Sequence, residues 1–262
     1  MVKRPGMSAR LLLMFSIVAA RVATAAEPLP ENSPPLRYEK PKVLAGKIYA
    51  QGSDRSQPLF TFKRTATREG ARLNVLREYN YPDGKAAARE RVVYEGDQLR
   101  SYELEELQIG ANGKATLQPS PGASAAGTIR FEYTQKRTAT ATEALRKDTL
   151  IADMVGPFLS SQWDRLLRGE EVKCRYIVVP RKETVGFAFV KTRQEIRRGK
   201  EVLIVKMEPS SAILSTLVDP LFFVIEKDGR HRVLEYSGRT TPKWGKDNKW
   251  RNLDAVTVFE WD

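Results

Sequence analysis

After residue 41 the chain is a series of short runs in which apolar and polar residues alternate, separated by residues typical of turns. The alternation is clearest at residues 129–133, where Ile129, Phe131 and Tyr133 fall on one face and two charged residues on the other. Separators such as Pro82-Asp83-Gly84 favour the backbone conformations of hairpin turns. Connections this short favour antiparallel neighbours, so the pattern predicts one large antiparallel sheet with one face in water.

The strands predicted from this pattern cover most of the chain. They are residues 43–50, 59–67, 71–81, 86–94, 98–109, 115–118, 128–135, 172–179, 184–196, 201–208, 221–225, 233–236 and 254–261. The pair Asp228-Gly229 marks a hairpin turn between residues 221–225 and 233–236. A short apolar run at residues 210–218 precedes this hairpin, and we expect the rest of the fold to be arranged around this unit.

Residues 148–169 are the exception, because their apolar positions recur at helical spacing. These positions are Leu150, Ile151, Met154, Val155, Phe158, Leu159, Trp163, Leu166 and Leu167. Asp148 is placed to cap the start of a helix and Gly169 to end it. Gly156-Pro157 predicts a kink or two consecutive helices, because proline removes an interior hydrogen bond. The apolar face is expected to cover a sheet; the alternative is a membrane-surface helix, which would carry more Lys and Arg.

The predicted fold class is therefore mainly β (α+β): a strongly curved antiparallel sheet or half-barrel with a helical plug or lid inserted at about residues 148–169. Residues 1–26 are predicted to be a signal peptide and the proline-rich residues 27–41 an extended leader. Residues 42–262 then form a single β-rich domain.

The first 26 residues have the three parts of a secretory signal. Lys3, Arg4 and Arg10 precede an apolar run at residues 11–20, and a small-residue stretch follows at residues 23–26. The apolar run is shorter than the roughly 20 residues of a spanning helix. We therefore expect a periplasmic or secreted protein after removal of the signal.

The charge balance favours an anionic partner. The formal net charge is +12, and removal of the four basic residues of the signal leaves 40 basic against 32 acidic residues, or +8. Phospholipid headgroups, lipopolysaccharide or acidic polymers would suit such a protein. Residues 197–200 read as a solvated hairpin turn, so no nucleic-acid partner is expected. The sequence leaves the oligomeric state open.

Residues suited to catalysis are scarce. His231 is the only histidine, and its place just after a predicted turn suggests a side chain in water. Cys174 lies on an apolar strand face and is expected to be a buried thiol, although Lys173 and Arg175 would activate it if it were exposed. No phosphate-binding loop, nucleophile elbow or zinc-binding motif occurs. We therefore expect no enzyme activity, no cofactor and no metal.

Two sets of residues are candidates for binding. An apolar lining for a half-barrel is predicted from Phe158, Trp163, Phe187, Phe189, Phe222, Phe223 and Ile225; the alternative is that they form a filled core. A surface site is predicted in a basic loop at residues 242–252, from Lys243, Trp244, Lys246, Lys249, Trp250 and Arg251. Its tryptophans suit a lipid interface or a sugar, or a structural cap over a sheet edge.

The order of elements resembles that of the bacterial lipoprotein-carrier (LolA/LolB-like) half-barrel families and their exported relatives. The resemblance rests on the signal peptide, the successive antiparallel strands, the inserted helices and the late hairpin at residues 223–230 leading into residues 234–239. It implies one sheet bent around an apolar cavity for acyl chains, with helices on the concave side. This chain is longer and has more strands before its first helix.

These observations lead to two hypotheses of function. The first is an exported, non-enzymatic binding protein that holds an apolar or lipid-like ligand in a half-barrel. The alternative is a cell-envelope interaction module that uses the basic tryptophan-containing loop on a membrane, a glycan or a protein. The expected partners are accordingly a lipid or other apolar ligand and an anionic envelope surface.

Overall fold

A computed structural model describes residues 42–118, 127–211, 219–246 and 249–261. The predicted signal peptide, the leader and most of the apolar run at residues 210–218 lie outside these ranges. The first strands are β1 Val43–Ala50, β2 Phe60–Glu69, β3 Arg72–Asn80, β4 Ala86–Glu95, β5 Gln98–Glu106, β6 Ala111–Gln118, β7 Thr128–Thr134 and β8 Thr138–Ala144. The others are β9 Thr149–Leu150, β10 Val172–Val178, β11 Glu183–Arg197, β12 Lys200–Pro209, β13 Leu221–Glu226, β14 Val233–Lys246 and β15 Lys249–Glu260.

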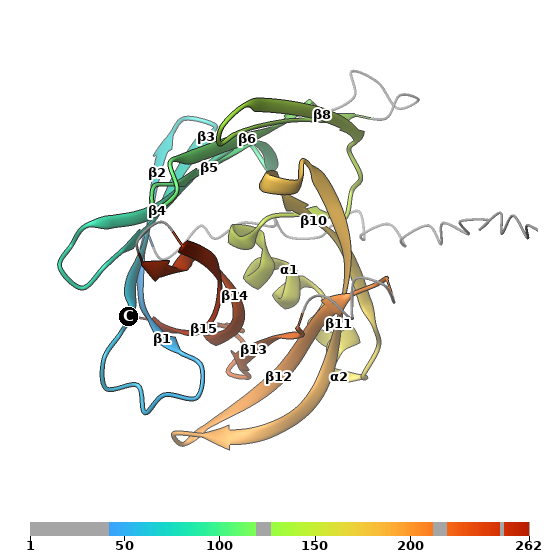
Figure 1. Cartoon of the computed structure of the whole chain (residues 1–262). Helices are drawn as coiled ribbons and strands as arrows, with labels where there is room; N and C mark the ends of the chain where they lie inside the picture. Colours follow the sequence, from blue (N-terminus) through green and yellow to red (C-terminus); the bar gives the residue numbers. More distant parts are fainter. Residues whose placement is uncertain (1–41, 119–126, 212–218, 247–248, 262) are drawn as a thin grey trace, which may run out of the picture.

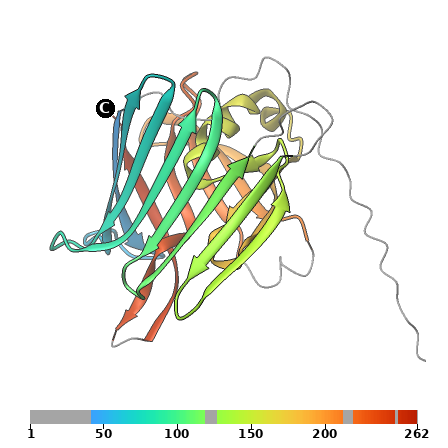
Figure 2. The ribbon, with the colours of Figure 1, turned by 90° about the horizontal axis from the view of Figure 1, so that it is seen from above.

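All fifteen strands of the described residues belong to one curved sheet, as Figures 1 and 2 show. Its order is β8-β7-β6-β5-β4-β3-β2-β1-β15-β14-β13-β12-β11-β10-β9, so β1 and β15 join two meanders. Every pair is antiparallel except β9 with β10. The predicted mainly β half-barrel is confirmed.

The two edges of the sheet approach each other without forming a ladder. The edge strands β8 and β9 are neighbours in sequence, and a side chain bridges the gap beside them. Glu143 of β8 accepts hydrogen bonds from the backbone N–H of Thr184 at 3.0 Å and from its hydroxyl at 2.7 Å. These contacts hold the curved sheet in an almost closed shape.

The inserted helical segment lies inside the curve (Figure 1). It consists of a 3₁₀ turn η1 (Ala152–Met154) and two helices, α1 (Val155–Ser161) and α2 (Trp163–Leu167). The prediction of two short helices is confirmed, and Gly169 follows them with a φ of 81°. The predicted start at Asp148 is wrong, because residues 149–150 pair with β10. The predicted break at Pro157 is also wrong: this residue lies in the first turn of α1, where its missing N–H has no intrahelical partner to lose.

Two other strand predictions need correction. Strand β8 was not predicted, because its sequence Thr-Ala-Thr-Ala-Thr-Glu-Ala contains no large apolar residue. The predicted loop at residues 242–252 is wrong: β14 and β15 continue through most of it as a hairpin. This longer hairpin forms one side of the candidate site.

Candidate functional site

The β14–β15 hairpin bends away from the sheet before it reaches its tip. Its pairing is regular up to Arg239 opposite Asp254 and resumes at Lys243 opposite Asn252, so residues 240–242 face a single residue, Leu253. Extra residues on one strand bend it and increase its twist. Residues 243–246 and 249–252, the capping hairpin, thus cross one end of the half-barrel, opposite the end occupied by the helices (Figures 1 and 2).

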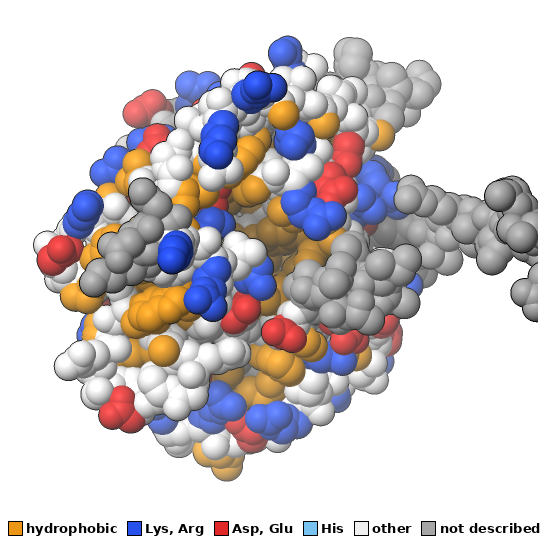
Figure 3. Space-filling view, viewed as in Figure 1, with side chains coloured by type: hydrophobic (Ala, Val, Ile, Leu, Met, Phe, Trp, Pro, Cys, Tyr) orange, Lys and Arg blue, Asp and Glu red, His pale blue; other side chains and the backbone are white. Residues whose placement is uncertain are grey.

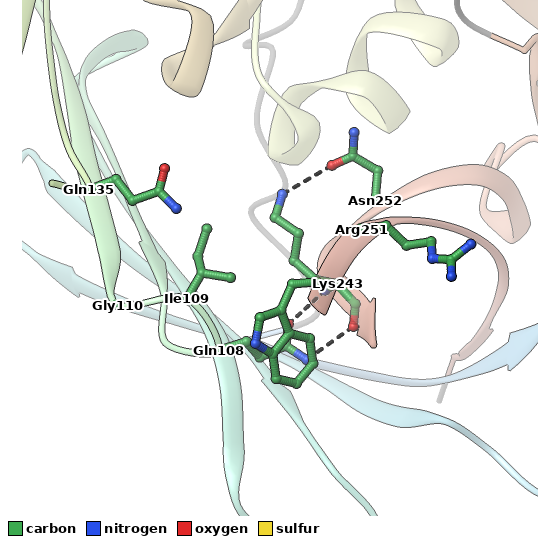
Figure 4. A pocket seen from close by; sticks show the side chains of 8 residues that line it. Gln108, Ile109, Gly110, Gln135, Lys243, Arg251 and Asn252 are labelled. Atoms are coloured by element: carbon green, nitrogen blue, oxygen red, sulfur yellow. Dashed lines mark hydrogen bonds between the residues drawn. The ribbon is translucent and has the colours of Figure 1, made fainter. Parts of the chain in front are cut away.

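The side chain of Gln108 fastens the capping hairpin to the opposite wall. Its Oε1 accepts the backbone N–H of Lys243 at 2.6 Å, and its Nε2 donates to the Lys243 carbonyl at 3.0 Å (Figure 4). The same Nε2 donates to the hydroxyl of Tyr81 at 2.6 Å. Strand β13 pairs with β14 only as far as Ser237, so it does not reach Lys243. The side-chain amide of Gln108 therefore satisfies the backbone N–H and carbonyl of Lys243 in place of a neighbouring strand.

Two carboxylates of the wall add to this attachment. Glu106, only 3% exposed, binds Lys243 Nζ at 2.7 Å and accepts a hydrogen bond from the Tyr133 hydroxyl at 2.7 Å. Burial, together with this neighbouring carboxylate, raises the pKa of Tyr133. The hydroxyl of Thr241 donates to Glu90 on β4. The capping hairpin is therefore held by charge-assisted hydrogen bonds, which are stronger than neutral ones.

A pocket of about 730 Å³ lies between the capping hairpin and this wall. Its lining comes from the β5–β6 turn (Gln108, Ile109 and Gly110), the β7–β8 turn (Gln135) and the hairpin (Lys243, Trp250, Arg251 and Asn252), as Figure 4 shows. The volume is in the range of small-ligand sites, roughly 300–1,000 Å³. Figure 3, from the same direction as Figure 1, shows a hollow with hydrophobic side chains inside and charged side chains of both signs around it.

The pocket lining offers hydrogen-bond donors and contains no acidic residue. The indole N–H of Trp250 is buried and has no partner among the described residues. Arg251 is exposed and forms no ion pair within the part of the chain that the structure describes. Asn252 Oδ1 accepts from Lys243 Nζ at 3.1 Å, so its amide N–H groups remain for a ligand. These groups suit a ligand rich in oxygen and carrying negative charge.

Gly245 is needed for the shape of the capping hairpin. It lies opposite Trp250 with a φ of 153°, and a Cβ at this position would be 2.2 Å from the carbonyl oxygen of Lys249. A side chain here would push the two strands apart and move the indole that lines the pocket.

The six predicted surface residues have different positions. Lys243, Trp250 and Arg251 line the pocket, whereas Trp244 is 51% exposed and Lys249 is also exposed. The side chain of Lys246 lies outside the described part of the structure. Sequence reasoning missed Gln108, Ile109, Gly110, Gln135 and Asn252, which line the pocket too. Gln108, Ile109 and Gly110 lie in a turn more than 130 residues before Lys243, so no local sequence pattern indicates that they line a pocket with the hairpin.

The predicted apolar lining is mostly packed core. Phe158, Phe187, Phe189, Phe223 and Ile225 are buried in the main cluster, and none of them lines the pocket. The Phe189 ring lies 5.7 Å from that of Phe158 and 5.9 Å from that of Phe223. The grouping of Phe222 with these residues is wrong, because it packs with Val202 and Ile204 in a separate cluster. Neighbouring residues of a strand face opposite sides of the sheet.

His231 and Trp163 form a contact that the sequence did not indicate. Their rings stack at 3.9 Å, and His231 Nδ1 lies 2.9 Å from Ser160 Oγ on α1. The expectation that His231 faces water is therefore wrong. Burial lowers the pKa of His231, with Asp228 and Asp164 opposing the shift. The contact fastens the helices to the β13–β14 turn, and Ser160 is 71 residues away in sequence.

Acidification through the titration of His231 is expected to destabilise the fold. The pKa in the folded protein lies below the ordinary 6.5, so this contribution to stability is complete above that value and is lost as the pH falls below it. Between about pH 7.5 and about pH 5, Tm should fall further in the wild type than in His231→Phe, which keeps a ring against Trp163 but does not titrate. Calorimetry of both proteins tests this; parallel Tm curves would contradict it.

A buried ion pair joins the helical segment to the sheet. Arg64 of β2 donates from Nε to Asp153 Oδ1 at 2.6 Å and from Nη2 to Oδ2 at 3.2 Å, and the Tyr94 hydroxyl donates to Oδ2 at 2.9 Å. Next to it, Arg77 pairs with Glu90 across β3 and β4. Neither pair was predicted from the sequence. The Arg64–Asp153 pair anchors the helical segment from inside the half-barrel.

Comparisons with protein-family models, curated proteins and solved structures find no match. No described helix is long and apolar enough to cross a membrane. Within the same residues, no three His, Cys, Asp or Glu side chains are placed to hold a metal ion.

Cys174 is buried, as predicted, and burial raises the pKa of its thiol, so Lys173 and Arg175 do not activate it.

Proposed function

We propose that this protein is a non-enzymatic binding protein of the cell envelope, and that its ligand is an oxygen-rich anion held in the pocket under the capping hairpin. Residues 1–26 would direct it there. Sugar hydroxyls and carboxylates, or the phosphate of a lipid headgroup, have the required chemistry. The proposal uses the basic, tryptophan-containing segment at the mouth of the half-barrel.

The unpaired indole N–H of Trp250 is the observation that carries this proposal. It is buried at a pocket without an acidic residue. A buried donor without a partner costs about 1–3 kcal/mol, and a ligand oxygen that reaches this nitrogen as the ring shifts on binding would recover it. Arg251 borders the same pocket with its guanidinium directed away from Ile109 and Gln135 (Figure 4), and no described carboxylate pairs with it. The indole N–H requires an acceptor, and the positive charge of Arg251 at the border of the pocket favours an anionic acceptor over a neutral one.

Titration calorimetry with soluble probes tests the proposal. The probes are glucuronate, inorganic phosphate and dihexanoyl phosphatidylglycerol below its micelle concentration, with dihexanoyl phosphatidylcholine as the zwitterionic comparison. We expect Trp250→Phe, which keeps a ring but loses the N–H, and Arg251→Gln each to weaken binding of the preferred anion by roughly tenfold to a hundredfold. The probe that binds best distinguishes an acidic sugar from a phosphorylated headgroup.

A matched control is available at another turn. Arg198 lies exposed between β11 and β12, so Arg198→Gln removes the same charge far along the chain from the pocket. It should leave binding of the probes unchanged. Equal losses in the Arg198 and Arg251 variants would show that overall charge, and not the pocket, attracts the anion. Unchanged affinity in Trp250→Phe and Arg251→Gln would contradict the proposed site.

A lipid-like ligand is the second candidate, because hydrophobic side chains are visible within the hollow in Figure 3. The headgroup would then occupy the polar pocket, and an apolar part would point toward the interior. Mass spectrometry of lipids extracted from protein purified from its native envelope tests this idea. If no lipid co-purifies and a soluble acidic sugar still binds, the lipid is excluded as the ligand and the acidic sugar is supported.

A further inference from the structure

We infer that the rim of the pocket docks on an anionic lipid bilayer. The docking face consists of Leu107 in the β5–β6 turn and of Trp244, Lys249 and Arg251 on the capping hairpin. The inference deepens the proposed function, since it names a membrane as the source of the ligand, but docking can be measured without the pocket being filled.

The first observation is the position of exposed apolar side chains. Four large hydrophobic residues are exposed among those that the structure describes: Val43, Leu107, Ile196 and Trp244. Leu107 is 43% exposed and Trp244 is 51% exposed. Each directly adjoins one member of the Gln108–Lys243 contact, so two distant segments present them at the same rim. An exposed Trp and an exposed Leu on segments joined by such a contact are typical of an interfacial anchor.

The second observation is the charge of the same surface. The charged side chains described in the capping hairpin are all basic: Lys243, Lys249 and Arg251. Glu106 neutralises Lys243, whereas Lys249 and Arg251 are exposed and form no ion pair within the described ranges. Basic residues next to apolar anchors are attracted to anionic headgroups. An acidic bilayer therefore complements this face better than a neutral surface does.

The third observation connects the docking face with the pocket. Arg251 lies directly opposite Trp244 in the hairpin, so both residues belong to one cross-strand pair. Arg251 also borders the pocket, and three of the other lining residues, Gln108, Ile109 and Gly110, come from the same turn as Leu107. With Trp244 at the level of the headgroups, a phosphate of the bilayer would lie at the pocket entrance. The docked protein is then placed to receive a headgroup from the membrane.

Sedimentation with large vesicles tests the inference. Wild-type protein should bind vesicles containing phosphatidylglycerol, bind those of phosphatidylcholine alone more weakly, and lose binding to the former as salt is raised. The double variant Leu107→Ser/Trp244→Ser should bind the phosphatidylglycerol vesicles at least about tenfold more weakly than the wild type. Ile196→Ser is the matched control, because Ile196 is 74% exposed on another hairpin, and it should bind like the wild type.

Several outcomes would overturn the inference. These are no binding of the wild type to anionic vesicles, unchanged binding of the double variant, or an equal loss in Ile196→Ser. Binding of soluble polygalacturonate that depends on Leu107 and Trp244, without vesicle binding, would assign the face to a glycan instead. Binding of the soluble anionic probes by the double variant keeps the two proposals separate, since Leu107 and Trp244 do not line the pocket.

Discussion

Replacing Asp153 by asparagine is expected to lower the free energy of unfolding by about 3–5 kcal/mol, because it removes the carboxylate that pairs with the buried guanidinium of Arg64. The two side chains are 2% and 1% exposed, so water cannot replace the lost partner. Arg77 lies directly opposite Arg64 in the sheet, which adds a second positive charge nearby. Guanidinium unfolding followed by tryptophan fluorescence measures the difference.

A matched control is the exposed pair of Arg181 and Glu183. Its side chains are 56% and 38% exposed, so Glu183→Gln should change stability by no more than about 1 kcal/mol. A similar small effect for Asp153→Asn would show that the buried pair does not hold the helical segment. Replacing both members by apolar residues, as in Arg64→Met/Asp153→Leu, should recover part of the loss, because no uncompensated charge remains.

The same carboxylate contributes to acid sensitivity. Burial by itself would raise the pKa of Asp153, but the charge and hydrogen bonds of Arg64, with Arg77 and Tyr94, outweigh burial and place the pKa below its ordinary value. The stabilisation is therefore present above the unfolded-state pKa of about 3.9 and is lost as the pH falls through the folded-state value. The stability of Asp153→Asn should vary less with pH in this acidic range.

Replacing Phe158 by alanine is expected to cost about 3–5 kcal/mol of stability while leaving binding in the pocket unchanged. Its ring is 1% exposed and packs against Phe189 inside the half-barrel. If Phe158 is core, the loss comes from the cavity left between helix and sheet. Unfolding measurements and probe titrations on one preparation separate the two effects.

The opposite result would favour a ligand in the interior. Near-native stability of Phe158→Ala, together with loss of a co-purifying lipid, would mean that the ring lines a space for acyl chains. Phe222→Ala provides the control, since this side chain is only partly buried and packs in another cluster, with Val202 and Ile204. It should cost less stability than Phe158→Ala and should not affect the lipid.

The alternation of apolar and polar residues also marks charged residues at buried positions of the strands. Phe60, Phe62 and Arg64 share one face of β2, and Leu73, Val75 and Arg77 share one face of β3. Glu90 likewise follows Ala88 on a buried face of β4. A charged residue in an apolar series indicates a buried ion pair, because an unpaired charge would be too costly inside. The partner of Arg64 was unpredictable, since Asp153 comes from a helical segment 89 residues later.

The sequence by itself determined most of the strands and turns, the antiparallel arrangement and the presence of a helical insertion. These features follow from local periodicity and from residues such as Gly229 and Gly169, which take a positive φ as turns and helix ends require. It also indicated that residues 243–251 would carry an unusual surface. Local patterns suffice where each residue's conformation is set by its immediate neighbours.

Only the tertiary structure decided where the pocket lies. Local preference favoured a loop at residues 242–252, because Pro242, Gly245 and several charged residues have low strand propensity. Hydrogen bonds from Gln108 and the carboxylate of Glu106 instead hold the segment as a hairpin across the open end. Contacts between residues more than 130 positions apart leave no local signal. The pocket, the unpaired indole of Trp250 and the position of Arg251 beside Trp244 all depend on them.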